Sequence, residues 1–344
     1  MAIEETYFKL TERMGLPDSK LLLGVLTRVM TPEEGRFLLE LPGSNAELAA
    51  KFNRDEKTIE KTIHDLARRG LVVASKKGFR LARDPGTLRD NMLASAPEFL
   101  PSEVPGLWKD FYLGEQANVL DDAWDKMEKP IIRVIPAQKS ISDISGVMPS
   151  ETVTGIVGAH IGPIALVNCS CRVMMRGCDH RVRACIHFGR RAEFDLFRGS
   201  GRELSADEAI AESLSAEEAG LINTVANASM PQAIEFLCHC CGCDCLALEH
   251  PLRTGKVRRV LSASRFLAKV DQEICTGCQE CVEWCYFNAI EMAKSIGSKK
   301  LKAAIGAGQC MGCGLCTIAC SVGAIEMECV RPPEHIPSEF IRVQ

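Results

Sequence analysis

Eight cysteines near the C-terminal end of the chain are spaced as metal ligands. They form two runs of the pattern C-x2-C-x2-C-x3-C, the second 35 residues after the first: Cys275, Cys278, Cys281 and Cys285, then Cys310, Cys313, Cys316 and Cys320. The letters AIEM follow both runs, so the segment is an internal repeat. This spacing places three thiolates on one tight loop and a fourth at the next helix start, as in [4Fe-4S] sites. Gly277 and Gly312 allow the loop to curl so that backbone N–H groups face the cluster sulfurs.

The repeat resembles the bacterial two-cluster ferredoxin family over roughly residues 266–330. In that family the fourth ligand of each cluster comes from the other run. The resemblance therefore implies two ligand sets, Cys275, Cys278, Cys281 and Cys320 for one [4Fe-4S] cluster and Cys310, Cys313, Cys316 and Cys285 for the other. The chain departs from the family where Tyr286 and Ser321 replace the usual prolines, and where a longer linker, AKSIGSKKLKAAIGAGQ, joins the runs. Zinc or reduced core thiols are the alternatives to clusters.

A second group of cysteines lies in the middle of the chain. It comprises Cys169, Cys171, Cys178, Cys185, Cys238, Cys240, Cys241, Cys243 and Cys245. The first two, in NCSCR, fit the end of a strand, and the last five, in CHCCGCDC, follow a predicted helix over Pro231–Leu237. Adjacent Cys240 and Cys241 would be strained as ligands of one ion, so the stretch favours a polynuclear cluster or two separate sites.

The middle segment resembles uncharacterised iron–sulfur proteins of anaerobic bacteria over about residues 130–330. The resemblance rests on NCSCR, ELSADEA and CHCCGCDC, which precede the two-cluster repeat. It implies one or two additional iron–sulfur clusters within residues 169–245, with structural zinc as the alternative. His187 and His239 lie among these thiols and are expected to orient ligands or face solvent more often than to bind metal.

The first half of the chain contains no cysteine and has helical patterns. Thr31, Pro32 and the acids after them predict a helix start. Ile59, Ile63 and Leu66 share one face of a helix within 55–69, and VVASKKGFRL predicts a two-stranded wing. This order resembles a winged-helix domain. The charges of the presumed recognition helix sum to zero, which favours protein docking, while Lys76, Lys77, Arg80 and Arg83 of the wing leave DNA binding open.

Composition limits the class of protein. The 344 residues include 41 Lys+Arg and 45 Asp+Glu, a formal charge of -4, with 46% apolar and 25% charged residues. These values exclude a globally basic nucleic-acid binder and wholesale disorder. The N-terminal residues lack a secretory pattern, so we expect a cytoplasmic protein whose 18 cysteines serve metal or redox chemistry. The uncharged stretch 152–171 predicts a buried helix, a Gly-Pro break and a strand, with no membrane span.

These observations predict a multi-domain α+β protein. We expect a winged-helix-like domain (1–95), a linker with connecting helices (96–130), a mixed α/β cysteine-rich domain (131–264), a ferredoxin-like 2[4Fe-4S] domain (265–330) and a tail (331–344). No nucleotide, flavin or nucleophile motif stands out. The predicted function is transfer of single low-potential electrons between partner flavin or iron–sulfur oxidoreductases, in an anaerobe, with a homo-oligomer left open. The alternatives are an iron–sulfur redox sensor that binds DNA and an oxidoreductase with a substrate-binding cluster in the middle domain.

Overall fold

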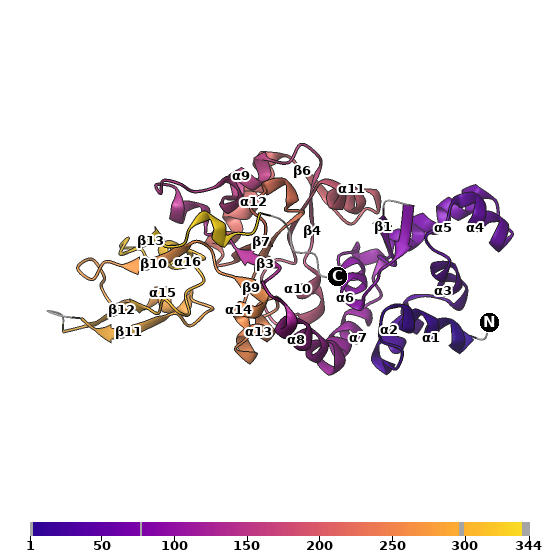
Figure 1. Cartoon of the computed structure of the whole chain (residues 1–344), viewed down its shortest axis with the longest axis horizontal. Helices are drawn as coiled ribbons and strands as arrows, with labels where there is room; N and C mark the ends of the chain where they lie inside the picture. The colour runs from indigo at the N-terminus through magenta and orange to yellow at the C-terminus, as the bar shows by residue number, and fades with distance from the viewer. Residues whose placement is uncertain (1–2, 76–77, 296–298, 339–344) are drawn as a thin grey trace. The chain divides into compact units, whose positions relative to one another are not determined.

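Figure 1 shows the computed structural model of the chain, which describes residues 3–75, 78–295 and 299–338. Contacts divide the chain into two compact units. The N-terminal unit comprises Met1–Ala123, Val167–Arg183 and Ala192–Arg202, and the C-terminal unit comprises Trp124–Leu166, Ala184–Arg191 and Glu203–Gln344. Helices and strands are both present, which confirms the predicted α+β class.

The N-terminal unit begins with helices followed by a hairpin. These elements are α1 (Ile3–Arg13), α2 (Lys20–Val29), α3 (Pro32–Leu39), α4 (Asn45–Phe52), α5 (Glu56–Arg68), β1 (Val72–Ser75) and β2 (Gly78–Leu81). The predicted helix start at Thr31 is present in α3, where Thr31 and Glu34 also form a capping box. Ile59, Ile63 and Leu66 form the buried face of α5. β1 and β2 pair antiparallel, and the wing lysines Lys76 and Lys77 lie outside the described residues.

Further helices directly follow the hairpin, and two more come later in the chain, after strands of the large sheet. They are α6 (Pro85–Leu93), the 3-10 turn η1 (Pro97–Phe99), α7 (Val104–Phe111), the π-helical turn η2 (Tyr112–Gln116), α8 (Ala117–Lys126), α10 (Ser170–Met175) and α11 (Gly189–Phe197). Trp108, Phe111 and Tyr112 are fully buried in the N-terminal unit. The proline-rich stretch expected as a linker therefore contains the start of a helix that packs on α2.

A seven-stranded sheet forms the centre of the C-terminal unit, in the order β6-β4-β5-β8-β7-β3-β9. Its strands are β3 (Ile132–Val134), β4 (Ile164–Asn168), β5 (Arg183–Phe188), β6 (Arg202–Leu204), β7 (Ile222–Ala226), β8 (Phe236–Cys240) and β9 (Leu261–Ser262). The helices and turns between them are η3 (Gln138–Ile141), η4 (Pro149–Glu151), α9 (Val153–Gly158), α12 (Ala206–Glu218), η5 (Pro231–Ala233), α13 (Glu249–Thr254) and α14 (Val257–Val260). One apolar core includes Ile186, Val225 and Leu237, and another includes Val134, Ile222 and Cys240.

The helix predicted over Pro231–Leu237 is wrong. Only η5 is helical there, for a single 3-10 turn, and the chain then enters β8. β8 contributes Leu237 to one core and Cys240 to the other. A central strand that is covered on both faces lacks the alternation that would have distinguished it from a short helix.

The C-terminal repeat consists of two halves, one for each cysteine run, whose strands pair with one another. Its elements are β10 (Phe266–Val270), α15 (Glu280–Glu283), β11 (Ile290–Lys294), β12 (Leu301–Ile305), α16 (Leu315–Ala319), β13 (Ile325–Cys329) and the turn η6 (Pro333–His335). β10 pairs antiparallel with β13, and β11 pairs antiparallel with β12 (Figure 1). The first strand of the repeat therefore pairs with the last, so neither half forms its sheets alone.

Several bonds attach the repeat to the rest of the C-terminal unit. The backbone N–H of Ala137 donates to the carbonyl of Cys313 at 2.9 Å, and the N–H of Ser264 donates to the carbonyl of Met311 at 3.0 Å. Arg265 and Glu151 form a buried two-point ion pair, with N···O distances of 2.9 and 3.0 Å. A shared apolar core, which includes Cys240, Leu248, Phe266 and Met311, fills the space between the sheet and the repeat.

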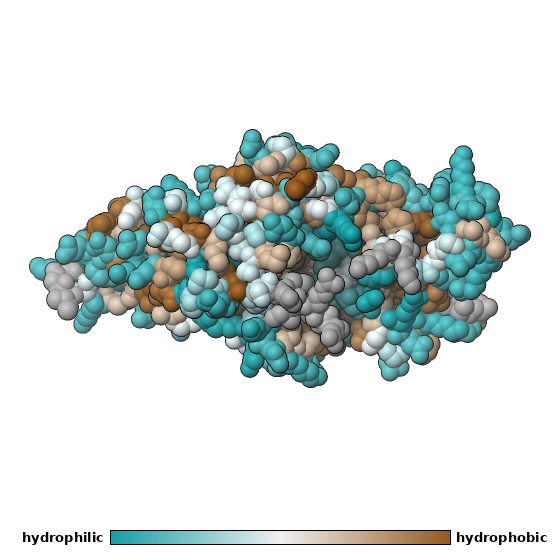
Figure 2. Space-filling view, turned by 45° about the horizontal axis from the view of Figure 1, so that its top comes forward, coloured by the Kyte–Doolittle hydropathy of each residue, from teal (hydrophilic) through white to brown (hydrophobic). Residues whose placement is uncertain are grey.

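The surface mixes polar and apolar side chains. Hydrophilic and hydrophobic residues are interspersed over the face shown in Figure 2. Among the described residues, the structure contains no helix with the length and apolar character needed to cross a bilayer.

Candidate metal centres

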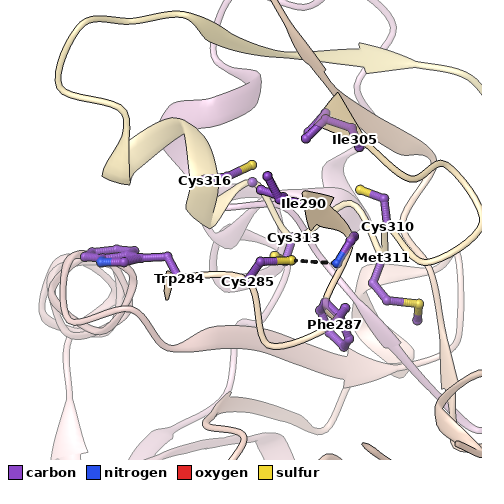
Figure 3. A pocket seen from close by; sticks show the side chains of 12 residues that line it. Trp284, Cys285, Phe287, Ile290, Ile305, Cys310, Met311, Cys313 and Cys316 are labelled. Atoms are coloured by element: carbon purple, nitrogen blue, oxygen red, sulfur yellow. Dashed lines mark hydrogen bonds between the residues drawn. The ribbon is translucent and has the colours of Figure 1, made fainter. Parts of the chain in front are cut away.

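One cavity of the C-terminal unit gathers four cysteines from both runs of the repeat. Cys310, Cys313 and Cys316 come from the second run, and Cys285 is the last cysteine of the first run. Their side chains line one space, which we call the inner cavity (Figure 3). Apolar side chains complete its wall: Phe287, Ile290, Ile305 and Met311. The four cysteines are one of the two sets that the ferredoxin resemblance implies.

A second cavity gathers the remaining four cysteines of the repeat. Cys275, Cys278 and Cys281 of the first run and Cys320 of the second run line another space, which we call the outer cavity. Met292, Ala303 and Val322 are among its other walls. The two cavities therefore exchange their fourth cysteine because the two halves of the repeat interleave.

The backbone of the two runs has the same unusual conformation at matching positions. Gly277 and Gly312 have positive φ angles of 76° and 68°. A Cβ at Gly312 would overlap the side chain of Ser264 and the carbonyl of Phe266. Left-handed backbone at these positions is natural for glycine, so the predicted curl of both loops is present. Gln279 and Gly314 form the next matching left-handed pair, at the N-caps of α15 and α16.

Backbone N–H groups donate to the fourth cysteine of each run. The N–H of Ala289 lies 3.3 Å from Sγ of Cys285, and the N–H of Ala324 lies 3.2 Å from Sγ of Cys320. Figure 3 draws the first of these bonds at the edge of the inner cavity. Hydrogen bonds to cysteine sulfur stabilise its thiolate form and raise the reduction potential of a cluster bound to it. The repeated AIEM letters had marked both alanines, although spacing alone gave no reason to name them as donors.

Burial makes the inner cavity unfavourable for bare thiolates. It raises the pKa of the Cys313 thiol to about 12 and also raises the pKa of Cys316 and Cys285. These thiols stay protonated at neutral pH unless a positive charge enters the cavity, because a buried anion without a counter-charge is costly. Four converging thiols in an apolar cavity fit a bound iron–sulfur cluster, which supplies that charge.

The two cavities differ in their access to solvent. Cys278, Thr276 and Gln279 of the first loop are exposed, whereas Met311, Gly312 and Leu315 of the second loop are buried. The bonds from Ala137 and Ser264 cover the second loop. The first loop is therefore more exposed than the second to a partner protein that approaches from solvent.

The nine middle cysteines are divided between the two units. Cys169 caps the start of α10, Cys171 lies in α10 and Cys178 follows it, all in the N-terminal unit. Cys185 on β5 and Cys238 and Cys240 on β8 belong to the C-terminal unit, as do Cys241, Cys243 and Cys245 after β8. The structure describes all 18 cysteines, and none of them forms a disulfide.

The histidines that lie among these cysteines are buried on the sheet. His239 places Nδ1 2.5 Å from the carbonyl of Ala184, so this nitrogen is engaged by the backbone. His187 is paired in register with Phe236 across β5 and β8.

The comparison with protein families gives one result. Residues 274–334 match the 4Fe-4S dicluster domain. The match covers both cysteine runs, so the chain carries a C-terminal ferredoxin-like domain that binds [4Fe-4S] clusters. This protein is an iron–sulfur protein. Searches of curated proteins and of solved structures found no match.

Proposed function

We propose that the chain is an electron-transfer protein with one [4Fe-4S] cluster in each cavity of the repeat. The proposed ligands are Cys285, Cys310, Cys313 and Cys316 in the inner cavity and Cys275, Cys278, Cys281 and Cys320 in the outer cavity. The observation that carries the proposal is the gathering of four cysteines in each cavity, three from one run and one from the other. A bound [4Fe-4S] cluster supplies single-electron exchange.

The chain's own residues give the two sites different tasks. The exposed loop around Cys278 lets a redox partner approach the outer site, while most residues of the loop around Cys313 are buried. The apolar walls of the inner site and its Ala289 N–H donor set the electrostatic environment that tunes its potential. We therefore propose that electrons enter or leave through the outer site.

We propose that the N-terminal unit contains a winged-helix fold that docks on a protein partner. Helices α3 to α5 followed by the β1–β2 hairpin support this fold. The exposed side chains of α5 include Glu56, Glu60 and Asp65 as well as Lys57, Lys61 and Arg68. Arg69 at its C-cap is paired with Glu34 instead of facing solvent as a phosphate contact. This mixed face favours a protein partner over a DNA backbone.

Anaerobic metal analysis of the whole chain tests the electron-transfer proposal. The two clusters require at least about eight iron and eight sulfide per chain, with paramagnetic signals after chemical reduction. Cys313→Ala and Cys278→Ala should each remove one cluster and leave the other. Cys329→Ala, which changes an exposed cysteine outside both cavities, is the matched control. A protein that holds zinc in place of iron at both cavities would refute the proposal.

A further inference from the structure

Three cysteines lie on one face of the central sheet, and two of them, Cys238 and Cys240, pack in the core shared with the repeat. Cys185 on β5 is the register partner of Cys238 on β8, so their side chains share a face. Cys240, two residues further along β8, points the same way. Thr224 on β7 confirms this face, because its hydroxyl lies 3.2 Å from Sγ of Cys240.

A fourth thiol reaches the same place from the loop after β8. Sγ of Cys245 donates to Sγ of Cys240 at 3.0 Å. The exposed fractions are 8% for Cys185, 5% for Cys240 and 6% for Cys245, and Cys238 is partly buried beside the same core. Cys185 and Cys238 are thus neighbours across two strands, Cys240 and Cys245 are in contact, and these two pairs lie next to each other along β8 in a water-poor region of the C-terminal unit.

The spacing of these thiols can be compared with what a single zinc ion and a polynuclear cluster each require. A single zinc ion with bonds of about 2.3 Å draws its four sulfurs close together. Along a strand, the Cα atoms of residues two positions apart are separated by about 6.6 Å, a spacing at which Cys238 and Cys240 can bind different metal ions of a polynuclear cluster. Cys240 and Cys245 lie closer, with 3.0 Å between their sulfurs, so these two thiols must move apart when a cluster binds. Among the residues that the structure describes, no three of these four sulfurs lie within 4.8 Å of one another. The same holds for the four cysteines of either cavity in the repeat.

We infer that Cys185, Cys238, Cys240 and Cys245 hold a third iron–sulfur cluster, on the sheet face next to the inner cavity. This inference rests on the proposed function for its electron partner, but its ligands are independent of the eight cysteines of the repeat. The site would add a one-electron centre behind the inner cluster.

One contact connects the third site with the inner cavity. A Cβ on Gly242 would lie 2.6 Å from Cδ1 of Tyr286, so the tyrosine ring rests directly on the backbone of the loop between Cys240 and Cys245. Tyr286 follows Cys285 in the chain, and Cys285 lines the inner cavity. Tyr286 occupies the position at which the ferredoxin family has a proline. The tyrosine ring packs against Gly242, a contact that a proline could not make in the same way. The ring of Tyr286 thus gives electrons a packed path between the third site and the inner cavity.

The test compares the whole wild-type chain with Cys240→Ala and with the control Cys329→Ala, all prepared without air. We expect Cys240→Ala to lose about four iron and four sulfide, or about two of each for a binuclear cluster. At least about eight iron and the reduced-state signals of the repeat should remain, which also shows that the variant has folded. Cys238→Ala should give the same loss, and the control should lose nothing.

Other outcomes overturn the inference. Equal iron in wild type and both variants would show that these cysteines hold no cluster. One zinc per wild-type chain that disappears in Cys240→Ala would replace the cluster with a structural ion. A Cys240–Cys245 disulfide, detected by thiol titration and mass analysis of protein prepared without air, would also overturn it. If the repeat itself holds no iron, as shown by the Cys313→Ala and Cys278→Ala comparison, the proposed function fails separately.

Discussion

At the residue scale, Gly314 shows how closely the second cysteine loop lies against its neighbours. Its φ is +73°, and a Cβ there would overlap the side chain of Ser140 and lie 3.3 Å from the backbone nitrogen of Ala137. Gly323 has a similar φ of +68° but no heavy atom within 4 Å of a Cβ position. Alanine substitution at Gly323 measures the free energy cost of a left-handed backbone alone, whereas substitution at Gly314 adds the cost of the overlap with Ser140.

We expect Gly314→Ala to destabilise the protein more than Gly323→Ala does. The control should lose about 1 kcal/mol from the left-handed conformation alone. Gly314→Ala should lose a further ~1–3 kcal/mol because the loop must move away from Ser140. Anaerobic denaturation, followed by loss of cluster absorbance, measures both. Equal losses in the two variants would show that the contact with Ser140 contributes nothing.

The residues of the two cavities were largely predictable, and their surroundings were not. The eight cysteines were identified from their spacing, and the curl of both loops was predicted from the glycines Gly277 and Gly312. The left-handed conformation of Gln279 and the contact between Tyr286 and Gly242 depend on tertiary packing, so no local pattern announced them. The sheet face that gathers Cys185 and Cys240 likewise appears only once β5 and β8 are paired.

At the element scale, a buried ion pair ties the start of β10 to η4. The side chains of Arg265 and Glu151 are 4% and 1% exposed. The hydrogen bonds that Arg265 donates to the Glu151 carboxylate raise the pKa of Arg265, and Arg265 also donates to the carbonyl of Gly146 at 2.9 Å. Removing one partner would leave a buried charge without its counter-charge.

We expect Glu151→Gln and Arg265→Met each to destabilise the protein by about 3–5 kcal/mol. The double variant should lose less than the sum of the two, because no unpaired charge remains. Denaturant unfolding of the four proteins in one double-mutant cycle measures the coupling. Additive losses would mean that the pair does not act as a unit.

The C-terminal end of α12 contains a second buried acid, which gives the protein a pH dependence. Burial raises the pKa of Glu217 from 4.5 to about 7. Its carboxylate accepts hydrogen bonds from the Gln138 N–H at 3.0 Å and from Asn223 at 2.6 Å. Between pH 4.5 and 7 the folded protein therefore holds a proton that the unfolded chain has released.

We expect stability to fall as pH rises through this window, by about 3 kcal/mol in total. Glu217→Gln, which cannot ionise, should remove most of the fall. Glu203→Gln changes an exposed acid and is the control. Unfolding in denaturant at several values between pH 5 and 8 measures the slope. A wild-type slope that persists in Glu217→Gln would assign it to other groups.

Sequence reasoning at this scale succeeded where elements have local signals. The capped start of α3 and the buried face of α5 were predicted because caps and helical periodicity are local. β8 was mistaken for a helix because both of its faces are buried. The order of the seven strands has no local signal either, since it is set by which strands pair.

At the scale of the whole molecule, four acidic side chains are exposed on and beside the first cysteine loop, where Lys302 also lies and donates to the carbonyl of Gln272. Asp271, Glu273, Glu280 and Glu283 are all exposed around the first cysteine loop. A partner that docks there is expected to carry basic residues, because complementary charges speed productive encounters. The same charges should repel small anions.

We expect the double variant Glu273→Gln/Glu280→Gln to be oxidised by ferricyanide, an anion, roughly two- to fivefold faster than wild type at low salt. The difference should shrink as salt rises. Glu98→Gln/Glu103→Gln makes the same charge change at exposed positions in the N-terminal unit and should leave the rate near wild type. Stopped-flow bleaching of the reduced protein measures these rates. Unchanged rates in the first variant would mean that electrons leave by another surface.

The interleaved halves of the repeat also constrain how the protein is made. With the proposed ligands, a nascent chain that has emerged only as far as β11 offers three of the four thiols of the outer site and one of the inner site. The outer set is complete only when Cys320 leaves the ribosome. Assembly factors that deliver iron and sulfide to the outer site must therefore act after both cysteine runs have been translated, and a premature stop before Cys320 costs the outer cluster even though most of its binding loop has been translated.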